Sequence, residues 1–329
     1  SKHLRGSDSD IYDQVSAIRE DVFSNGDDAL ISLAKKFDNV QDENFSLTVT
    51  EEDFQYAYTR VAPDVIDAIK RAKENIELFH KRQLPDSWSD TFDNGIMYGN
   101  RFLAIEKVGL YVPGGLAPYP STVLMNAIPA QIAGVEEITL VTPPQKNGNI
   151  PSQILVAAEI CGVKNIIKVG GAQAIFALAY GTETVSPVYK IVGPGNKFVT
   201  AAKQMVYGTV DIDKPAGPSE VLVFFDDEKY IPFAAAELLA QCEHDPDASV
   251  IGIGPNKEAL IALQLEMDRQ VETCSRKNII LEAAKNSALF AISDPDVVID
   301  VINDCASEHL VLLTDRYDSY LNRVKNAGS

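Results

Sequence analysis

The stretch NIIKVGGAQAIFALAYG, residues 165–181, shows the local pattern that decides the fold of this chain. A short apolar run ends in a pair of glycines, and an apolar segment of helix length follows at once. Strands that are apolar along their length, without polar residues at alternate positions, are typical of parallel sheets covered by helices on both faces. The stretch therefore predicts a buried strand, a tight turn and a helix, which together form one repeat of an α/β fold.

The same order of elements recurs on both sides of this stretch. VGLYVP (108–113) predicts a strand, and STVLMNAIPAQIAG (121–134) predicts a helix that begins after Ser121 and stops at Gly134. Further strands and helices alternate in EITLVTPP (137–144), ILVAAEICG (154–162), YKIVGPG (189–195) and NKFVTAAKQMVYG (196–208). Strict alternation predicts a doubly wound, Rossmann-like domain over residues 111–220.

The flanking residues predict a second domain. The first hundred residues are mostly helical, with apolar residues at helical spacing in 11–23, 29–37, 48–61 and 65–84 and a capping box at Thr50 and Asp53. Strand-like runs return in 220–225, 250–254, 296–302 and 309–314. We expect two doubly wound Rossmann-like α/β domains, with 111–220 inserted in a discontinuous domain made of 1–110, an N-terminal helical region, and 221–329.

Composition narrows the class of protein. With 29 basic and 47 acidic residues the net charge is −18, which argues against nucleic acid and anionic membranes as partners. The four cysteines are scattered without a CxxC pair, as expected for reduced thiols, and no apolar run is long enough to span a membrane. These features favour an enzyme or scaffold of the cytoplasm.

Three glycine-rich turns follow predicted strands and precede predicted helices: YVPGGLAPYPST, KVGGAQA and VGPGNK. Glycine lets the backbone approach a phosphate, and the positive end of a helix favours negative charge. None of the turns is a complete GxGxxG fingerprint, so a simple tight turn explains any one of them as well; three in succession favour a nucleotide site. Gln173 and Asn196 begin two of these helices, where an amide either caps the backbone or binds a cofactor.

A rigid segment and two Glu-His pairs are further candidates. In IDKPAGPSEVLV (212–223), Ser219 either ends a turn or faces a site. In LLAQCEHDPDA (238–248), Gln241 and His244 share a helix face and could bind a metal, although a histidine stabilised by the helix end is the simpler interpretation. Glu308 and His309 precede a predicted strand. They are either two catalytic bases or one buried and one solvated residue.

Taken together, these stretches resemble histidinol dehydrogenase. The motifs VGLYVPGGLAPYPSTVLMNAIPAQIAG, VGGAQAIFALAYGT, IVGPGNKFVTAAKQMVYG, VDIDKPAGPSEVLV, LLAQCEHDPDA and ASEHL occur in the order of that family, and the resemblance extends from KFD (36–38) to the last residues. It implies NAD-dependent oxidation of L-histidinol to L-histidine through histidinaldehyde, with a bound zinc. The implied site residues are Tyr111, Gln173 and Asn196 for NAD, Ser219 and His309 for substrate, Gln241 and His244 for zinc and substrate, and Glu308 and His309 as catalytic bases.

The implied roles fit the chemistry of these side chains. A zinc ion that holds the substrate's amine and imidazole would orient its alcohol carbon toward the nicotinamide. His309 would remove the alcohol proton, because histidine exchanges protons near neutral pH. Glu308 would deprotonate the water that adds to the aldehyde before the second oxidation.

The sequence departs from the family pattern at its ends. It begins without Met and stops at NRVKNAGS (322–329), so we expect a trimmed chain. In the family, two more zinc ligands, an aspartate and a histidine, follow this position in a segment that is exchanged between the subunits of a homodimer. We therefore expect this chain to bind zinc weakly or not at all, and the full-length protein to form a homodimer.

Two other functions are compatible with the same features. One is a related zinc- and NAD-dependent dehydrogenase of another small amino- or sulfo-alcohol. The other is a nucleotide-binding fragment without catalysis, against which the intact Glu308-His309 pair argues.

Overall fold

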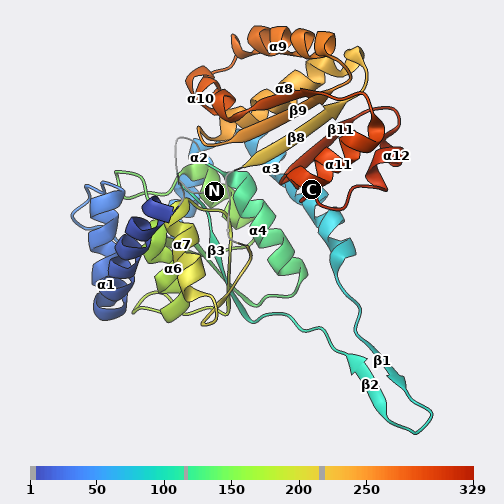
Figure 1. Cartoon of the computed structure of the whole chain (residues 1–329). Coiled ribbons are helices and arrows are strands. Elements are labelled where there is room, and N and C mark those ends of the chain that lie inside the picture. Colours follow the sequence, from blue (N-terminus) through green and yellow to red (C-terminus); the bar gives the residue numbers. More distant parts are fainter. Residues whose placement is uncertain (1–4, 115–117, 215–218) are drawn as a thin grey trace. The chain divides into compact units, whose positions relative to one another are not determined.

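The structure is a computed structural model that describes residues 5–114, 118–214 and 219–329. The chain divides into two compact units, unit 1 (Ser1–Ala216) and unit 2 (Gly217–Ser329) (Figure 1). Residues 115–117 (GLA) of the first glycine-rich turn and the PAGP segment at 215–218, both singled out in the sequence, lie outside the described residues.

Unit 1 is built on a five-stranded parallel sheet in the order β5-β4-β3-β6-β7. Its strands are β3 (Lys107–Tyr111), β4 (Glu137–Thr142), β5 (Asn165–Lys168), β6 (Lys190–Val192) and β7 (Asp211–Ile212). The strand order reverses between β3 and β6, which is the topological switch point where such sheets bind ligands at their carboxyl ends.

Helices cover both faces of this sheet. One face carries α4 (Pro120–Ile132), α5 (Ser152–Ile160), α2 (Glu51–Arg60) and α3 (Pro63–His80). The other carries α6 (Gly171–Tyr180), α7 (Lys197–Val206) and α1 (Arg5–Phe37), which Figure 1 shows together on one side of β3. Strand β3 serves both cores, because Leu110 points into the first and Tyr111 into the second.

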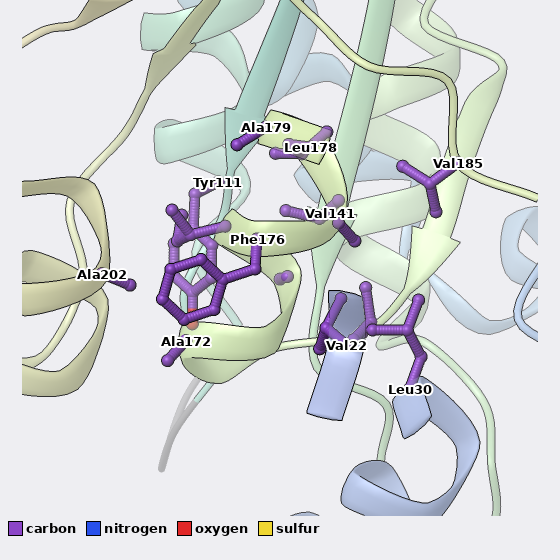
Figure 2. Packing of buried hydrophobic residues seen from close by; sticks show 14 of the residues in the cluster. Val22, Leu30, Tyr111, Val141, Ala172, Phe176, Leu178, Ala179, Val185 and Ala202 are labelled. Carbon is purple, nitrogen blue, oxygen red and sulfur yellow. The ribbon is translucent and has the colours of Figure 1, made fainter. Parts of the chain in front are cut away.

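The N-terminal helices belong to unit 1. Helix α1 joins the two predicted helices across a kink at Gly26, and its residues Val22 and Leu30 are buried in the core of α6 that Figure 2 shows. The capping box of Thr50 and Asp53 begins α2, as predicted. The compact units thus group residues 1–110 with 111–216, because the apolar faces of α1, α2 and α3 pack on α4–α7. This grouping differs from the predicted one, which joined 1–110 with 221–329.

An exposed hairpin interrupts unit 1 between α3 and β3. A short 3-10 turn, η1 (Lys81–Gln83), ends the long predicted helix, and the antiparallel strands β1 (Trp88–Thr91) and β2 (Met97–Asn100) follow. Every residue of both strands is exposed. The sequence did not indicate this hairpin.

Unit 2 is a four-stranded parallel sheet in the order β10-β9-β8-β11. Its strands are β8 (Glu220–Phe225), β9 (Ser249–Gly254), β10 (Ala288–Ala291) and β11 (His309–Leu313). One face packs on α8 (Ile231–His244), α9 (Lys257–Val271) and α10 (Lys277–Ala283), with the short turns η2 (Glu228–Tyr230) and η3 (Ala284–Asn286). The other face packs on α11 (Pro295–Cys305) and α12 (Tyr317–Leu321).

The predicted class, two Rossmann-like α/β units with parallel sheets, is confirmed, and one element is corrected. The run 296–302, predicted as a strand, lies inside α11. Its buried residues Val298, Ile299 and Ile302 recur at helical spacing, and Asp294 caps the helix ahead of Pro295. The strand of this region is β10 instead. Among the described residues, no helix is both long enough and apolar enough to cross a membrane.

Candidate active site

A cavity of 1680 Å³ opens at the carboxyl ends of the strands of unit 1. The last residues of three neighbouring strands line it: Tyr111 of β3, Thr142 of β4 and Lys168 of β5. Gln173 in the first turn of α6 and Asn196 at the N-cap of α7 line it too. The three residues predicted to bind NAD thus meet in one cavity, which exceeds the usual volume of a small-molecule site, roughly 300–1,000 Å³.

Tyr111 is held at the floor of this region. Its side chain is 3% exposed, and its hydroxyl oxygen accepts a hydrogen bond of 3.0 Å from the backbone N–H of Gly171. Figure 2 shows its ring beside that of Phe176, with the hydroxyl toward the start of α6 near Ala172. Burial raises the pKa of Tyr111 to about 12, so it remains a neutral phenol at physiological pH.

Asn196 combines the two roles that the sequence left open. Its Oδ1 accepts hydrogen bonds from the backbone N–H groups of Phe198 (3.0 Å) and Val199 (3.1 Å), which caps α7. Because capping uses only the oxygen, the Nδ2 group is the part of the amide that can donate to a ligand in the cavity. Gln173 lies in the first turn of α6, 1% exposed, beside the positive-φ Gly171.

A buried ion pair, which sequence reasoning missed, fixes the turn before Asn196. Lys203 of α7 is 3% exposed and pairs with Asp213, while its Nζ donates to the carbonyl of Gly193 (2.9 Å). The carboxylate of Asp213 accepts from the N–H of Gly193 (2.8 Å). Gly193 has a φ of 120°, and a Cβ there would overlap the carbonyl oxygen of Tyr111. A lysine among apolar residues of a buried helix was the available signal.

Asp38 is a second residue that the sequence did not single out. It follows α1, lines the cavity and is half-buried, and its Oδ2 is buried without a hydrogen-bond partner among the described residues. Burial raises the pKa of this carboxyl to about 6. A carboxylate that lacks a partner beside a ligand cavity calls for a functional explanation.

The candidate residues of unit 2 lie at the opposite edge of their own sheet. Ser219 precedes β8, and His309 is the first residue of β11. Gln241 and His244 occupy the last turn of α8, which runs back toward the start of β9. The predicted site therefore gathers at the amino ends of these strands, whereas ligands of doubly wound sheets bind at the carboxyl ends as a rule.

A small pocket of 360 Å³ at this edge brings Gln241 and His309 together. Glu237 and Ser329 also line it, but Ser219, His244 and Glu308 do not. His244 is exposed at the end of α8. The structure thus joins one predicted zinc ligand and one predicted base in a single concave surface.

Glu308 and His309 do not simply point to opposite faces. Ala306 ends α11 in the left-handed conformation, with a φ of 46°, so the backbone is irregular just before the strand. The carboxylate of Glu308 and Nε2 of His309 are 4.0 Å apart, and Nδ1 of His309 forms a 2.7 Å hydrogen bond with the hydroxyl of Ser329. The side chains are 36% and 49% exposed, so both can reach a substrate.

The described residues do not complete a zinc site. Within them, no three His, Cys, Asp or Glu side chains come together as a metal cluster. Gln241 and His244 offer one neutral amide oxygen and one imidazole, whereas zinc takes four ligands and prefers imidazole, thiolate and carboxylate. The two residues can provide at most part of a coordination shell.

The carboxyl edge of unit 2 is closed by polar interactions. The carboxylate of Asp226 accepts hydrogen bonds from Thr314 (2.7 Å) and Arg316 (2.9 Å). Asp315 pairs with Lys229 and accepts a 2.6 Å hydrogen bond from the hydroxyl of Tyr230. This edge holds its charges in pairs, in contrast to the cavity of unit 1.

Comparison with known proteins identifies similar sequences and structures. Residues 2–329 match a family model described as histidinol dehydrogenase. The histidinol dehydrogenase of Clostridium acetobutylicum is 49% identical over 321 residues, 97% of this chain and 74% of that protein. That of Methanocaldococcus jannaschii is 48% identical with the same coverage. The crystal structure of histidinol dehydrogenase from Elizabethkingia anophelis superposes with a TM-score of 0.92 at 39% identity, covering 96% of this chain and 72% of that one.

Proposed function

Because the chain belongs to the histidinol dehydrogenase family, we propose that it oxidises L-histidinol to L-histidine through histidinaldehyde, with NAD bound to unit 1 and proton transfer by residues of unit 2. The observation that carries this proposal is the convergence of Tyr111, Gln173 and Asn196. These residues come from the end of β3 and the starts of α6 and α7, and they line one cavity at the switch point of the sheet.

The cavity of unit 1 suits a dinucleotide. Helices α6 and α7 begin at its wall, and the positive amino end of a helix favours an anionic ligand. Asn196 can donate through Nδ2, and the buried phenol of Tyr111 presents a neutral hydrogen-bonding group next to Gly171. When bound, NAD would accept a hydride in each oxidation step.

His309 is the base of the first oxidation. When the alcohol carbon loses a hydride, its hydroxyl must lose a proton, and an accessible imidazole nitrogen can take it. Nδ1 of His309 is engaged with Ser329, which leaves Nε2 as the acceptor. The ring is half-exposed at the pocket that Gln241 also lines, where a substrate can reach both.

Glu308 is the base of the second oxidation. Water adds to the aldehyde to give a hydrate, and loss of a second hydride then yields the carboxylate of histidine. The carboxylate of Glu308 takes the proton of the attacking water, and its position 4.0 Å from Nε2 lets the pair serve successive steps at one carbon. Ser219 and Gln241 would contact the substrate.

Zinc would add a template for the substrate's amine and imidazole, with Gln241 and His244 among its ligands. Gln241 and His244 are only part of a tetrahedral ligand set. The proton transfers proposed above are therefore assigned to His309 and Glu308 alone, without the metal. We expect less than one zinc per chain by elemental analysis of purified protein dialysed against a zinc buffer. Stoichiometric zinc would contradict this expectation.

Turnover with L-histidinol tests the proposal. We expect two NADH per histidinol, recorded by absorbance, and histidine as the product in amino-acid analysis. A control reaction uses L-histidine, which should give no NADH. If another amino alcohol reduces NAD and L-histidinol does not, the substrate assignment is wrong. Light scattering of the protein in solution would check the homodimer that the resemblance implies.

A further inference from the structure

Lys168 is a largely buried lysine whose ammonium has no anionic partner among the described residues. It ends β5, is 9% exposed and lines the cavity of unit 1. Among the residues that the structure describes, its ammonium interacts with the ring of Phe45 alone, whose centroid is 5.4 Å away. Throughout the described ranges, no carboxylate lies within 4.0 Å of this Nζ and no acceptor forms a hydrogen bond with it.

The other buried lysine of unit 1 shows how unusual this is. Lys203 has Asp213 as its counterion and the carbonyl of Gly193 as a further acceptor. Asp38, the half-buried carboxylate of the same cavity, does not neutralise Lys168, because its Oδ2 also lacks a partner in the part of the chain that the structure describes. The ammonium of Lys168 borders the cavity without a protein anion among the described residues, so a ligand anion in the cavity can provide its counter-charge.

The position of Lys168 relative to α6 supplies a second, independent argument. The strand ends at Lys168, Gly170 is the N-cap, and the ten-residue helix begins at Gly171. A Cβ at Gly170 would lie 2.5 Å from Pro143, so glycine keeps this turn close to the end of β4. The positive end of α6 and the ammonium therefore border the same cavity within a few residues of sequence.

We propose that Lys168 and the amino end of α6 bind the pyrophosphate of the dinucleotide. The proposal rests on the proposed function and deepens it, since it assigns the charged part of NAD to particular groups. The ammonium provides the counter-charge, and the first backbone N–H groups of α6 after Gly171 provide directed donors. Phe45 holds the ammonium by its ring face, so little side-chain freedom is lost on binding.

Binding of ADP-ribose and of adenosine separates the phosphate contact from the rest of the site. Calorimetric titrations would compare the wild type with Lys168→Met, Lys168→Arg and Lys146→Met. Lys146 lines the same cavity but is exposed, which makes it the matched control. We expect Lys168→Met to weaken ADP-ribose binding about tenfold or more and to leave adenosine binding unchanged. Lys168→Arg should keep most of the affinity, and Lys146→Met should stay within about twofold.

Three outcomes would overturn the inference. Lys168→Met could bind ADP-ribose as tightly as the wild type. It could lose affinity for adenosine to the same extent as for ADP-ribose. Lys146→Met could weaken ADP-ribose binding as much as Lys168→Met does. Retained adenosine binding shows that the variant is folded, and the arginine variant provides a second check. If the wild type itself binds neither NAD nor ADP-ribose, the proposed function fails at unit 1, and this result is distinct from the other three.

Discussion

The two units place their candidate site residues at different edges of similar sheets, the carboxyl edge in unit 1 and the amino edge in unit 2. Numbered within each unit, the strands of both sheets follow the order 3-2-1-4, with a fifth strand in unit 1. Unit 1 has its cavity at the carboxyl edge, beside Tyr111 and Lys168, whereas unit 2 has Gln241 and His309 at the amino edge. A shared topology therefore does not decide which edge of a sheet carries function, and side chains must be examined at both.

Local sequence explains the difference. In unit 1, glycines follow β5 and β6, so backbone and helix ends are accessible to a ligand. In unit 2, Asp226 follows β8 and Thr314 follows β11, and their side chains bond to each other across the carboxyl edge. Glycine turns keep an edge open for an anion, and paired charges close it.

The largest effect should come from the amino edge of unit 2. Glu308→Gln removes the carboxylate that we propose accepts the water proton, so the second oxidation should slow by about 10²–10⁴-fold while the first continues. Rapid-quench experiments should then find histidinaldehyde and one NADH per histidinol in place of two. Equal loss of both steps would contradict separate roles for Glu308 and His309.

The buried ion pair Lys203–Asp213 of unit 1 should affect stability and cofactor binding, and not the catalytic steps. Lys203→Met leaves Asp213 partly buried without its cation and releases Gly193, so we expect a loss of about 2–3 kcal/mol in the free energy of unfolding and weaker NAD binding. Urea unfolding and NAD titration measure the two effects.

The exposed pair Lys190–Asp211 of the same sheet, with an N–O distance of 2.5 Å, is the matched control. Lys190→Met should cost less than about 1 kcal/mol, because exposed pairs contribute little. Equal losses for Lys203→Met and Lys190→Met would show that burial of the pair does not matter.

Asp38 should give unit 1 a pH-dependent stability. Its pKa is about 6 in the folded chain against an ordinary value of 3.8, so between these values the unfolded chain releases the proton first. Stability therefore falls as pH rises from about 4 to 6, and the full penalty applies above pH 6. Asp38→Asn removes this penalty and should raise the free energy of unfolding by about 1–2 kcal/mol at pH 8, after allowance for partial exposure.

Urea unfolding of Asp38→Asn at pH 8 and pH 4 checks this sign. The gain should shrink several-fold at pH 4, because the folded wild type holds the proton there and the unfolded chain, close to its ordinary pKa of 3.8, holds it in part. Asp86→Asn, in the exposed segment before β1, is the control and should change stability at neither pH. A gain that is as large at pH 4 would mean that the charge of Asp38 is not its cause.

The smallest effect is expected at the carboxyl edge of unit 2. Arg316→Ala removes an exposed partner of Asp226, and we expect less than about 1 kcal/mol in unfolding and less than twofold in kcat. A large loss of turnover would place function at this edge and remove the contrast between the units.

Local patterns in the sequence were sufficient for much of the fold. The alternation of strand, glycine and helix predicts unit 1, and Thr50 with Asp53 predicts the start of α2. The β-branched residues of 296–302 predict a strand, but Asp294 and Pro295 form a helix-start signal that outweighs them.

Tertiary packing decided the remaining features. Nothing local shows that α1 packs on α6, because an amphipathic helix does not specify its partner. The direction of α8 sets the edge at which Gln241 lies. The lack of a hydrogen-bond partner for Oδ2 of Asp38 among the described residues appears only when the surrounding elements are assembled. The residues proposed to bind or react were predicted from the resemblance, and the structure shows that they divide between the two edges.

One pair of variants tests most directly whether unit 1 binds the cofactor and unit 2 transfers protons. NAD binding and NADH formation would be measured for Gln173→Ala and His309→Gln. We predict that Gln173→Ala weakens NAD binding about tenfold and keeps turnover at saturating NAD, whereas His309→Gln binds NAD like the wild type and forms NADH about 10²–10⁴-fold more slowly. Loss of NAD binding in His309→Gln, with normal binding in Gln173→Ala, would contradict the assignment.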